Sequence, residues 1–417
     1  MSRIKVKNFG PIKEGCIEND GWIDIEKVTV FIGNQGSGKS TIAKLISTMM
    51  WIEKSVVNGT IKKSDLCTSK YLLHYLKYQR IDNYFKEHSI FLNGTQIIYE
   101  GDFFLITTGR DYIFVKEKTQ NDYKYPKIMY VPDSRNFVST VEKPSTLKNL
   151  PKFLFDFLEE YEKSKLEMKD ILSLPLGEIS FKYNKQSKTS FLVGSEYEIN
   201  LTEASSGYQS YVPMFLVSNY LSNLIGKEND SSFKSISLEE DKRLKKEIAK
   251  ILLNKNLSEV VKEASLEILS KKFKYSAFIN IVEEPEQNLF PSSQRQILNS
   301  LLEFNNSTEA NKLILTTHSP YIINYLSTAI QAAYLKNKIV ASDVHHDEDI
   351  KKLNAIVPLK SLVDAKDVVI YQMDEKDGTI KKLPNYEGIP SDKNYLNEML
   401  ADGNHIFDAL LELEETI

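Results

Sequence analysis

A glycine-rich stretch near the amino terminus has the residue types and the spacing of a phosphate-binding loop. Gly33 is separated by four residues from Gly38, Lys39 and Ser40. Glycines let backbone N–H groups converge on phosphate oxygens, the lysine neutralises the outer phosphates, and the serine hydroxyl can ligate Mg²⁺. We therefore expect phosphates to contact the loop and the turn after it, which together comprise Gly33, Asn34, Gln35, Gly36, Ser37, Gly38, Lys39, Ser40 and Thr41.

The elements on either side of this loop position it for such binding. Residues 28–32 form an apolar, β-branched run that predicts a buried strand. From Lys39 onward, apolar residues recur at helical spacing, as at Ile42, Leu45 and Met49. Because a helix N-terminus carries partial positive charge, a strand, a glycine turn and a helix in this order favour an anion.

A second apolar run ends in adjacent carboxylates. Residues 278–282 are hydrophobic apart from Asn280, and Glu283 and Glu284 follow directly. A buried parallel strand brings the residues at its carboxyl end to the sheet edge where ligands bind. We expect Glu283 to ligate Mg²⁺ together with Ser40, and Glu284 to polarise the attacking water. A strand that simply exits into solvated glutamates would give the same pattern.

Two further motifs have the residue types to bind phosphate. His318 follows a third apolar run, residues 313–315, and could sense a γ-phosphate, although a lone histidine is more often structural. Ser206 and Gly207, with Gln209, precede an apolar helix expected over 211–224. Ser206 could cap that helix, and its free N–H groups would form an anion site, although an ordinary N-cap is common.

Composition narrows the class of protein. The chain has 417 residues, 26% charged and 41% hydrophobic, which is typical of a globular fold. A net charge of −4 gives no whole-chain bias toward nucleic acid or acidic lipid. Two cysteines, Cys16 and Cys67, match no metal-ligand spacing. We see no signal-peptide core and no membrane helix, so we expect a cytoplasmic protein.

The order of the expected elements predicts an α/β fold. Strands are expected over 4–9, 22–32, 128–131, 368–371 and 380–383, a β-meander over 89–115, a helical segment over 65–88, and a final helix over 404–413. We divide the chain into an N-terminal lobe (1–135), an inserted helical and β-hairpin region (136–200) and a C-terminal lobe (201–417), which carries a helical insertion at 227–274.

In chain order, these four motifs resemble the phosphate loop, signature, Walker B strand and switch histidine of ABC-type ATPase heads. The resemblance is closest to the group that contains RecF, SMC proteins and the overcoming-lysogenization-defect (OLD) ATPases. Residues 283–291 and 315–321 look especially like antiphage-defence ATPases such as AriA of the PARIS system and PtuA of Septu and retrons. The resemblance implies a P-loop mixed sheet with an antiparallel β-subdomain and an inserted helical region, and it implies hydrolysis of ATP with Mg²⁺.

The resemblance also implies partners. Heads of this kind form head-to-tail homodimers or larger homo-oligomers that enclose two ATP molecules. Ser206 and Gly207 of one copy would then meet the γ-phosphate held by Lys39 of the other, and residues 287–289 would cross the interface. In a defence system such an ATPase senses a phage protein and holds or releases a separate nuclease or toxin.

The sequence departs from the family pattern at several positions. Glu283 stands where aspartate is usual, and Tyr208 replaces the second signature glycine. In place of a clear glutamine loop, residues 131–135 are the expected neighbour of the nucleotide. The metal-dependent nuclease domain of OLD proteins is not expected, because only about 100 residues follow His318. Asp374 and Asp377 are interpreted as turn residues, and residues 345–349 as a charged surface loop.

Two other functions remain open on the sequence. A RecF- or SMC-type DNA repair or chromosome-maintenance head would use a basic helix face within residues 242–250, although glutamates are interleaved there. A nucleotide-gated scaffold that does not hydrolyse ATP is suggested by the longer carboxylate at Glu283.

Overall fold

The computed structural model describes most of the chain. The described residues are 2–67, 69–84, 94–108, 113–118, 123–141, 144–146, 149–169, 171–225, 238–254, 257–342 and 347–415. The first strand of the expected meander, at residues 89–92, and the histidines at 345 and 346 lie outside these ranges.

A seven-stranded mixed sheet forms the centre of the molecule. Its strand order is β2 (Gly15–Cys16), β16 (Thr379–Lys382), β15 (Val368–Met373), β4 (Val28–Gly33), β14 (Lys312–Thr317), β13 (Ala277–Glu283) and β8 (Pro126–Val131). The five strands from β15 to β8 run parallel, while β15 pairs antiparallel with β16. Because parallel strands end at the same edge, this sheet brings the ends of β4, β13 and β14 together.

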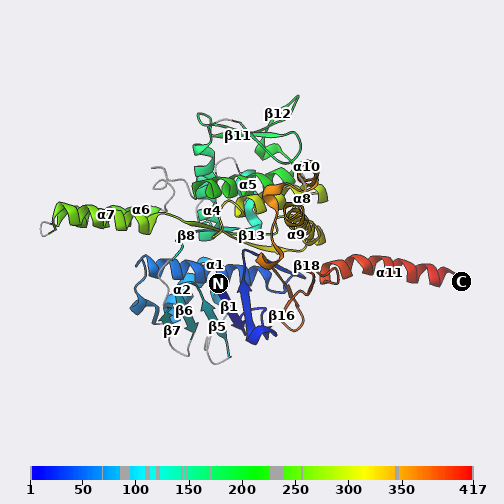
Figure 1. Ribbon diagram of the computed structural model, residues 1–417, viewed down its shortest axis with the longest axis horizontal. Coiled ribbons are helices and arrows are strands. Elements are labelled where there is room, and N and C mark those ends of the chain that lie inside the picture. Colours follow the sequence, from blue (N-terminus) through cyan, green and yellow to red (C-terminus); the bar gives the residue numbers. More distant parts are fainter. Residues whose placement is uncertain are drawn as a thin grey trace.

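Apolar residues alternate between the two faces of the central strand β4. Every residue of β4 is buried, as expected for a strand covered on both sides. Val30 and Ile32 belong to the core beneath α4 (Lys152–Glu167), α5 (Ser206–Leu224), α8 (Pro291–Asn305) and α9 (Pro320–Val340). Phe31 belongs to the core on the other face, with α1 (Lys39–Val57). Figure 1 shows α1 on one side of the sheet and the other four helices opposite.

A five-stranded antiparallel sheet lies beyond α1. Its order is β3 (Trp22–Ile25), β1 (Ser2–Lys7), β5 (Gln96–Glu100), β6 (Phe104–Thr108) and β7 (Ile113–Glu117). The buried strand expected over 28–32 is confirmed as β4, whereas the stretch expected over 22–32 is two strands, because β3 and β4 join different sheets. The chain turns between them, where the Glu26 N–H donates to the Thr29 hydroxyl at 3.0 Å. In the described part of the expected helical segment 65–88, residues 65–67 and 69–84, the one α-helix is α2 (Ser69–Tyr78).

The remaining elements surround this frame. A second antiparallel sheet has the order β12 (Glu198–Asn200), β11 (Thr189–Val193), β10 (Ser180–Asn184) and β9 (Leu172–Ser173), and the last small pair is β17 (Asn385–Tyr386) with β18 (Ile389–Pro390). Helices α6 (Leu238–Leu253) and α7 (Glu259–Phe273) project from one side, and α11 (Tyr395–Glu415) projects from the other (Figure 1). Helix α10 (Asp347–Ile356) follows α9. The expected final helix therefore begins nine residues earlier than predicted, at Tyr395 rather than at residue 404.

The predicted α/β fold, with a mixed sheet, an antiparallel sheet and helical additions, is confirmed. The boundaries between the three expected units stay a prediction. Asp374 and Asp377 do form a turn, since Asp374 accepts from the Lys376 N–H and Asp377 from the Thr379 N–H. Within the described ranges, no helix is both long and apolar enough to cross a membrane.

Candidate functional site

The phosphate loop connects β4 to α1 through three glycines in unusual conformations. Gly33, Gly36 and Gly38 have φ values of 146°, 78° and 100°, which side-chain-bearing residues rarely adopt. A Cβ atom on Gly33 would lie 2.2 Å from the carbonyl oxygen of Met373, so the loop leaves β4 at a point where only glycine fits. These glycines let the chain turn sharply and begin α1 at Lys39.

Lys39 points back into its own loop. Its Nζ donates to the carbonyl oxygens of Gly33 and Asn34, each at 2.8 Å. The side chain is only 5% exposed, and burial lowers the pKa of the ammonium to about 8, although the neighbouring carboxylates of Glu284 and Glu286 act in the opposite direction. A buried cation whose charge is incompletely balanced is suited to an anion, so the site fits a phosphate.

The other loop residues divide into outward and inward groups. Gln35, Gly36 and Ser40 are exposed, so their polar groups are accessible to a ligand. Thr41 and Ser37 are buried, and Ser37 Oγ has no hydrogen-bond partner among the described residues. The Thr41 side chain therefore faces the core rather than the open edge, which leaves its backbone N–H as the group that can contact a phosphate.

Asn34 connects the loop to the end of β15. Its Nδ2 donates to Oε1 of Glu375 at 3.0 Å, and this hydrogen bond lowers the pKa of the Glu375 carboxyl. Glu375 follows β15, the strand next to β4. The contact holds one side of the phosphate loop against the neighbouring strand.

Glu283 has an unused oxygen at the carboxyl end of β13. The residue is buried, and Oε2 accepts from the Asp133 N–H at 3.3 Å. Oε1 has no partner within the described ranges, and neither has Oγ1 of Thr316, which pairs with Glu283 in the parallel ladder. Oxygen atoms without partners fit a hard cation, so Glu283 and Ser40 would be its ligands.

The described residues contain no group of three or more histidine, cysteine and acidic side chains that could hold a metal by themselves. Mg²⁺ bound with a nucleotide does not require one. It typically uses one or two protein ligands and completes its shell with phosphate oxygens and water. The donor set here is thus of the kind that a nucleotide-bound Mg²⁺ uses.

Glu284, His318 and Lys39 form a chain of contacts across the site. Nε2 of His318 lies 3.2 Å from Oε1 of Glu284, and Nδ1 lies 3.4 Å from Nζ of Lys39. Because an ammonium can only donate, we infer that Nδ1 accepts and that Nε2 carries the proton. The hydrogen bond from His318 lowers the pKa of the Glu284 carboxyl. Glu284 is therefore ionised at neutral pH, as a group that polarises water must be.

Sequence reasoning did not identify Glu286 as part of the site. Its Oε1 accepts from the backbone N–H of His318 at 2.7 Å and from the hydroxyl of Thr317 at 2.8 Å. Glu286 thus holds the segment that carries His318, and burial raises the pKa of its carboxyl. Its position three residues after Glu283 was visible in the sequence, but the contact depends on β14 lying beside β13.

The signature segment forms the first turn of α5 and has its described contacts outside the phosphate loop. Ser206 is the first residue of α5 and is exposed; the N-cap is Ser205, so the prediction that Ser206 caps this helix was wrong. A Cβ atom on Gly207 would lie 2.9 Å from the carbonyl oxygen of Asn288, and Gln209 donates to the carbonyl of Thr202 at 2.8 Å. Among the described residues, no hydrogen bond or ion pair joins the signature segment to residues 33–41.

Arg135 was expected beside the nucleotide within residues 131–135. The prediction was wrong for this side chain, because Arg135 has no exposed surface and lies behind the carboxylates. The strand β8 that precedes it does end at the same edge as β13.

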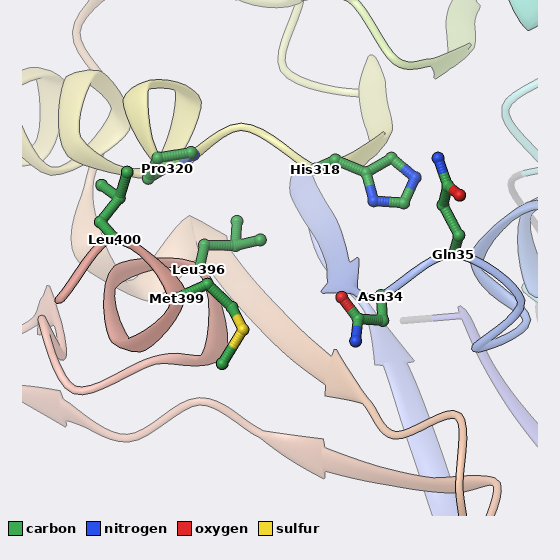
Figure 2. Close-up of a pocket in the computed structure, with 7 residues that line it drawn as sticks. All are labelled: Asn34, Gln35, His318, Pro320, Leu396, Met399 and Leu400. Atoms are coloured by element: carbon green, nitrogen blue, oxygen red, sulfur yellow. The ribbon is translucent and has the colours of Figure 1, made fainter. Parts of the chain in front are cut away.

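A cavity of ≈ 570 Å³ opens beside the loop. Figure 2 shows Asn34, Gln35 and His318 on one side and the first turns of α11 on the other. The α11 residues that line it are Leu396, Met399 and Leu400, joined by Pro320 of α9. The apolar spacing of Leu396, Met399 and Leu400 was visible in the sequence, but the predicted helix began too late to include these residues.

Residues 258–323 match the family model described as AAA ATPase domain (AAA_15). This segment includes β13, α8 and β14 and therefore Glu283, Glu284 and His318. No curated protein matches the chain significantly. The match and the phosphate loop support an ATP-hydrolysing P-loop NTPase.

Several solved structures are similar to the chain at low identity. The SMC head domain from Thermotoga maritima is 11% identical, with 92% of this chain and 98% of that chain covered and a TM-score of 0.35. The Smc head domain with an extended coiled coil from Pyrococcus furiosus is 9% identical, with 98% and 100% covered and a TM-score of 0.39. MJ0796, a bacterial ABC transporter cassette, is 10% identical, with 93% and 100% covered and a TM-score of 0.24. All three TM-scores are below 0.5, so these similarities carry no conclusion about function.

Proposed function

We propose that the chain is an ABC-type ATPase head that hydrolyses ATP with Mg²⁺ between two copies of itself. The observation that carries this proposal is the meeting of Lys39, Glu284 and His318 at one edge of the parallel sheet, with contacts of 3.2 and 3.4 Å between them. Three segments of the chain supply a cation, an ionised carboxylate and an imidazole at the phosphate loop.

Each residue then has a role that its geometry permits. Lys39 exchanges two carbonyl contacts for phosphate oxygens and neutralises their charge. Glu283 and Ser40 would hold a Mg²⁺ ion, which would supply electrostatic stabilisation of the phosphates. Glu284 orients a water molecule and accepts its proton, while His318 holds the Glu284 carboxylate and faces the terminal phosphate.

A second copy is needed because one chain supplies only part of this site. Ser206 is exposed at the N-terminus of α5, where free backbone N–H groups favour an anion. In a head-to-tail dimer, Ser206, Gly207 and Gln209 of one copy would face the phosphates held by the other. Charge-assisted hydrogen bonds to the terminal phosphate would then hold the dimer together, and hydrolysis would release it.

Sedimentation velocity with and without ATP and Mg²⁺ tests this assembly. The Glu284→Gln variant should remain dimeric with ATP, because it binds but does not cleave the nucleotide, whereas Lys39→Ala should stay monomeric. A Glu284→Gln variant that hydrolyses ATP at the wild-type rate would refute the assigned role of Glu284. A Lys39→Ala variant with full nucleotide affinity would refute the phosphate site.

We further propose that this ATPase belongs to a bacterial antiphage defence system. The support is the sequence likeness of residues 283–291 and 315–321 to defence ATPases. In this role the ATP-bridged heads sense a phage protein and hold or release a separate nuclease or toxin. Tagged Glu284→Gln captured from its native host should retain such an effector and lose it on infection. Retention of DNA and repair proteins, unchanged by phage, would instead favour a repair ATPase.

A DNA-binding head is the alternative, and it would use the basic face expected on α6. There Lys250 pairs with Glu247 at 2.7 Å in an exposed ion pair of the kind that contributes little energy. A scaffold that does not hydrolyse ATP is distinguished by turnover alone, since in that case Glu284→Gln would behave like the wild type.

A further inference from the structure

Arg135 is a fully buried arginine whose hydrogen bonds go to backbone carbonyls. Its exposed fraction is 0%. Nη1 donates to the carbonyls of Glu283 at 2.6 Å and Pro132 at 3.1 Å, Nη2 donates to that of Glu284 at 2.6 Å, and Nε donates to that of Ser210 at 3.2 Å. One side chain therefore joins the loop after β8, the end of β13 and the first turns of α5.

The charge of this guanidinium is balanced without a direct partner. No carboxylate oxygen of the described residues forms an ion pair with it, although Glu286, Glu284 and Glu283 lie near enough to favour its charged form. Burial lowers the pKa of Arg135 to about 10, so the group is still protonated at neutral pH. An apolar residue in this space would leave these carbonyls without their donor, so the side chain also has a structural role, which the variants below must separate from catalysis.

The Arg135 contacts converge on a strained peptide. Glu284 has φ of 44°, in a region that residues other than glycine rarely adopt. Its N–H donates to the carbonyl of Thr316 at 2.9 Å, and its carbonyl accepts from both Arg135 and the N–H of Gln287. Strained backbone persists when its surroundings fix it, and here that backbone sets the direction of the Glu284 carboxylate.

The fourth contact reaches the signature helix. Ser210 lies one turn after Ser206 and Gly207, and its side chain also donates to Oε1 of Gln287 at 3.1 Å. Because Arg135 contacts both segments, a shift of α5 would displace the Glu284 peptide as well. In a head-to-tail dimer, α5 is the element that would meet the nucleotide of the other copy.

We propose that Arg135 is a positioning residue for hydrolysis, which holds the Glu284 backbone in its productive conformation and couples it to the signature helix. This inference rests on the proposed function of Glu284. Arg135 does not contribute to binding of the phosphates, because it has no surface on the open edge of the sheet.

The test separates turnover from binding. In Arg135→Met we expect kcat to fall by about 100-fold, as for a displaced catalytic group, with the nucleotide affinity of the monomer unchanged. Arg135→Lys keeps the charge but cannot reach all the carbonyls, so we expect a smaller loss of about tenfold. The matched control is Lys127→Met. Lys127 is another buried cation, at the start of β8, which pairs with Glu160 at 3.0 Å far from the carboxylates. It should lower thermal stability without changing kcat of the folded enzyme.

A double-mutant cycle decides between positioning and general stability. If Arg135 acts through Glu284, the Arg135→Lys change should slow wild type but should not lower further the residual single-turnover rate of a Glu284→Gln background. Equal losses in both backgrounds, or a loss of affinity instead of kcat, would overturn the inference. If Arg135→Met does not fold, the Arg135→Lys cycle gives the same decision. A Glu284→Gln variant with normal turnover would contradict the proposed function itself, which is a distinguishable result.

Discussion

Replacing Lys39 by methionine should change the stability of the free protein little but remove most of its stabilisation by ATP. The side chain is 5% exposed, and burial lowers the pKa of the ammonium from 10.5 to about 8. One pKa unit is worth about 1.4 kcal/mol, so at neutral pH the buried charge costs the fold an upper limit of about 3 kcal/mol. Because the folded pKa is depressed, this cost is present below about pH 8 and fades as the pH rises toward the unfolded value.

Two hydrogen bonds offset that cost in the wild type. Lys39 donates to the carbonyls of Gly33 and Asn34, and each hydrogen bond from a charged group contributes about 1.5 kcal/mol or more, so the two together are close to the cost of burial. Lys39→Met removes the cost and the bonds together. We therefore expect the free energy of unfolding without ligand to stay within about 1 kcal/mol of wild type, or to rise.

With ATP present, the Lys39→Met protein should be less stable than the wild type. Hydrogen bonds between an ammonium and phosphate are charge-assisted and contribute about 1.5–3 kcal/mol each, so their loss should weaken binding by about 100-fold. At an ATP concentration of about 100 times the wild-type Kd, the ligand stabilises the wild type by about 2.7 kcal/mol and the variant by only about 0.4 kcal/mol. Urea unfolding with and without ATP and Mg²⁺ measures both quantities.

Lys312→Met is the matched control for this experiment. Lys312 is also a lysine whose pKa is lowered by burial, and it donates to the carbonyl of Ile25 at 2.7 Å, at the opposite end of β14 from His318. Its loss should leave the stabilisation by ATP intact. A Lys39→Met protein that unfolds readily without ligand, or that keeps the full ATP response, would refute the reasoning.

Three further outcomes follow from the site. The affinity of wild type for ATP should fall by up to tenfold per pH unit above about pH 8, as Lys39 loses its proton in the free protein, and titrations of Lys39→Met should lack this dependence. Glu283→Ala should raise the Mg²⁺ concentration needed for half-maximal turnover by about 10- to 100-fold, because it removes the unpartnered Oε1. An unchanged Mg²⁺ dependence would exclude Glu283 as a ligand. Gly207→Ala should weaken ATP-dependent dimerisation in sedimentation experiments, because the added Cβ would lie 2.9 Å from the Asn288 carbonyl oxygen. Monomers of this variant should bind nucleotide normally. A normal dimer would contradict the role of this turn.

Some parts of the fold could be read directly from local pattern. The strand, glycine turn and helix around Lys39 were predictable because glycine spacing and helical periodicity are properties of adjacent residues. The runs that end at Glu283 and His318 were predictable as buried strands for the same reason. The alternating residues 22–25 and the continuous apolar run 28–32 differ in pattern, but local pattern could not show that they join different sheets, because strand pairing is a tertiary contact.

The sequence by itself determined the chemistry available to this protein: a phosphate loop, a pair of carboxylates and a histidine, each at the end of an apolar run. Tertiary structure alone decided their arrangement. Parallel pairing of β4, β14 and β13 brings Lys39 and Glu284 to opposite nitrogens of His318. The same packing buries Arg135 behind the carboxylates instead of beside the nucleotide. Contacts between residues more than a hundred positions apart depend on strand order and register, and no local spacing encodes these.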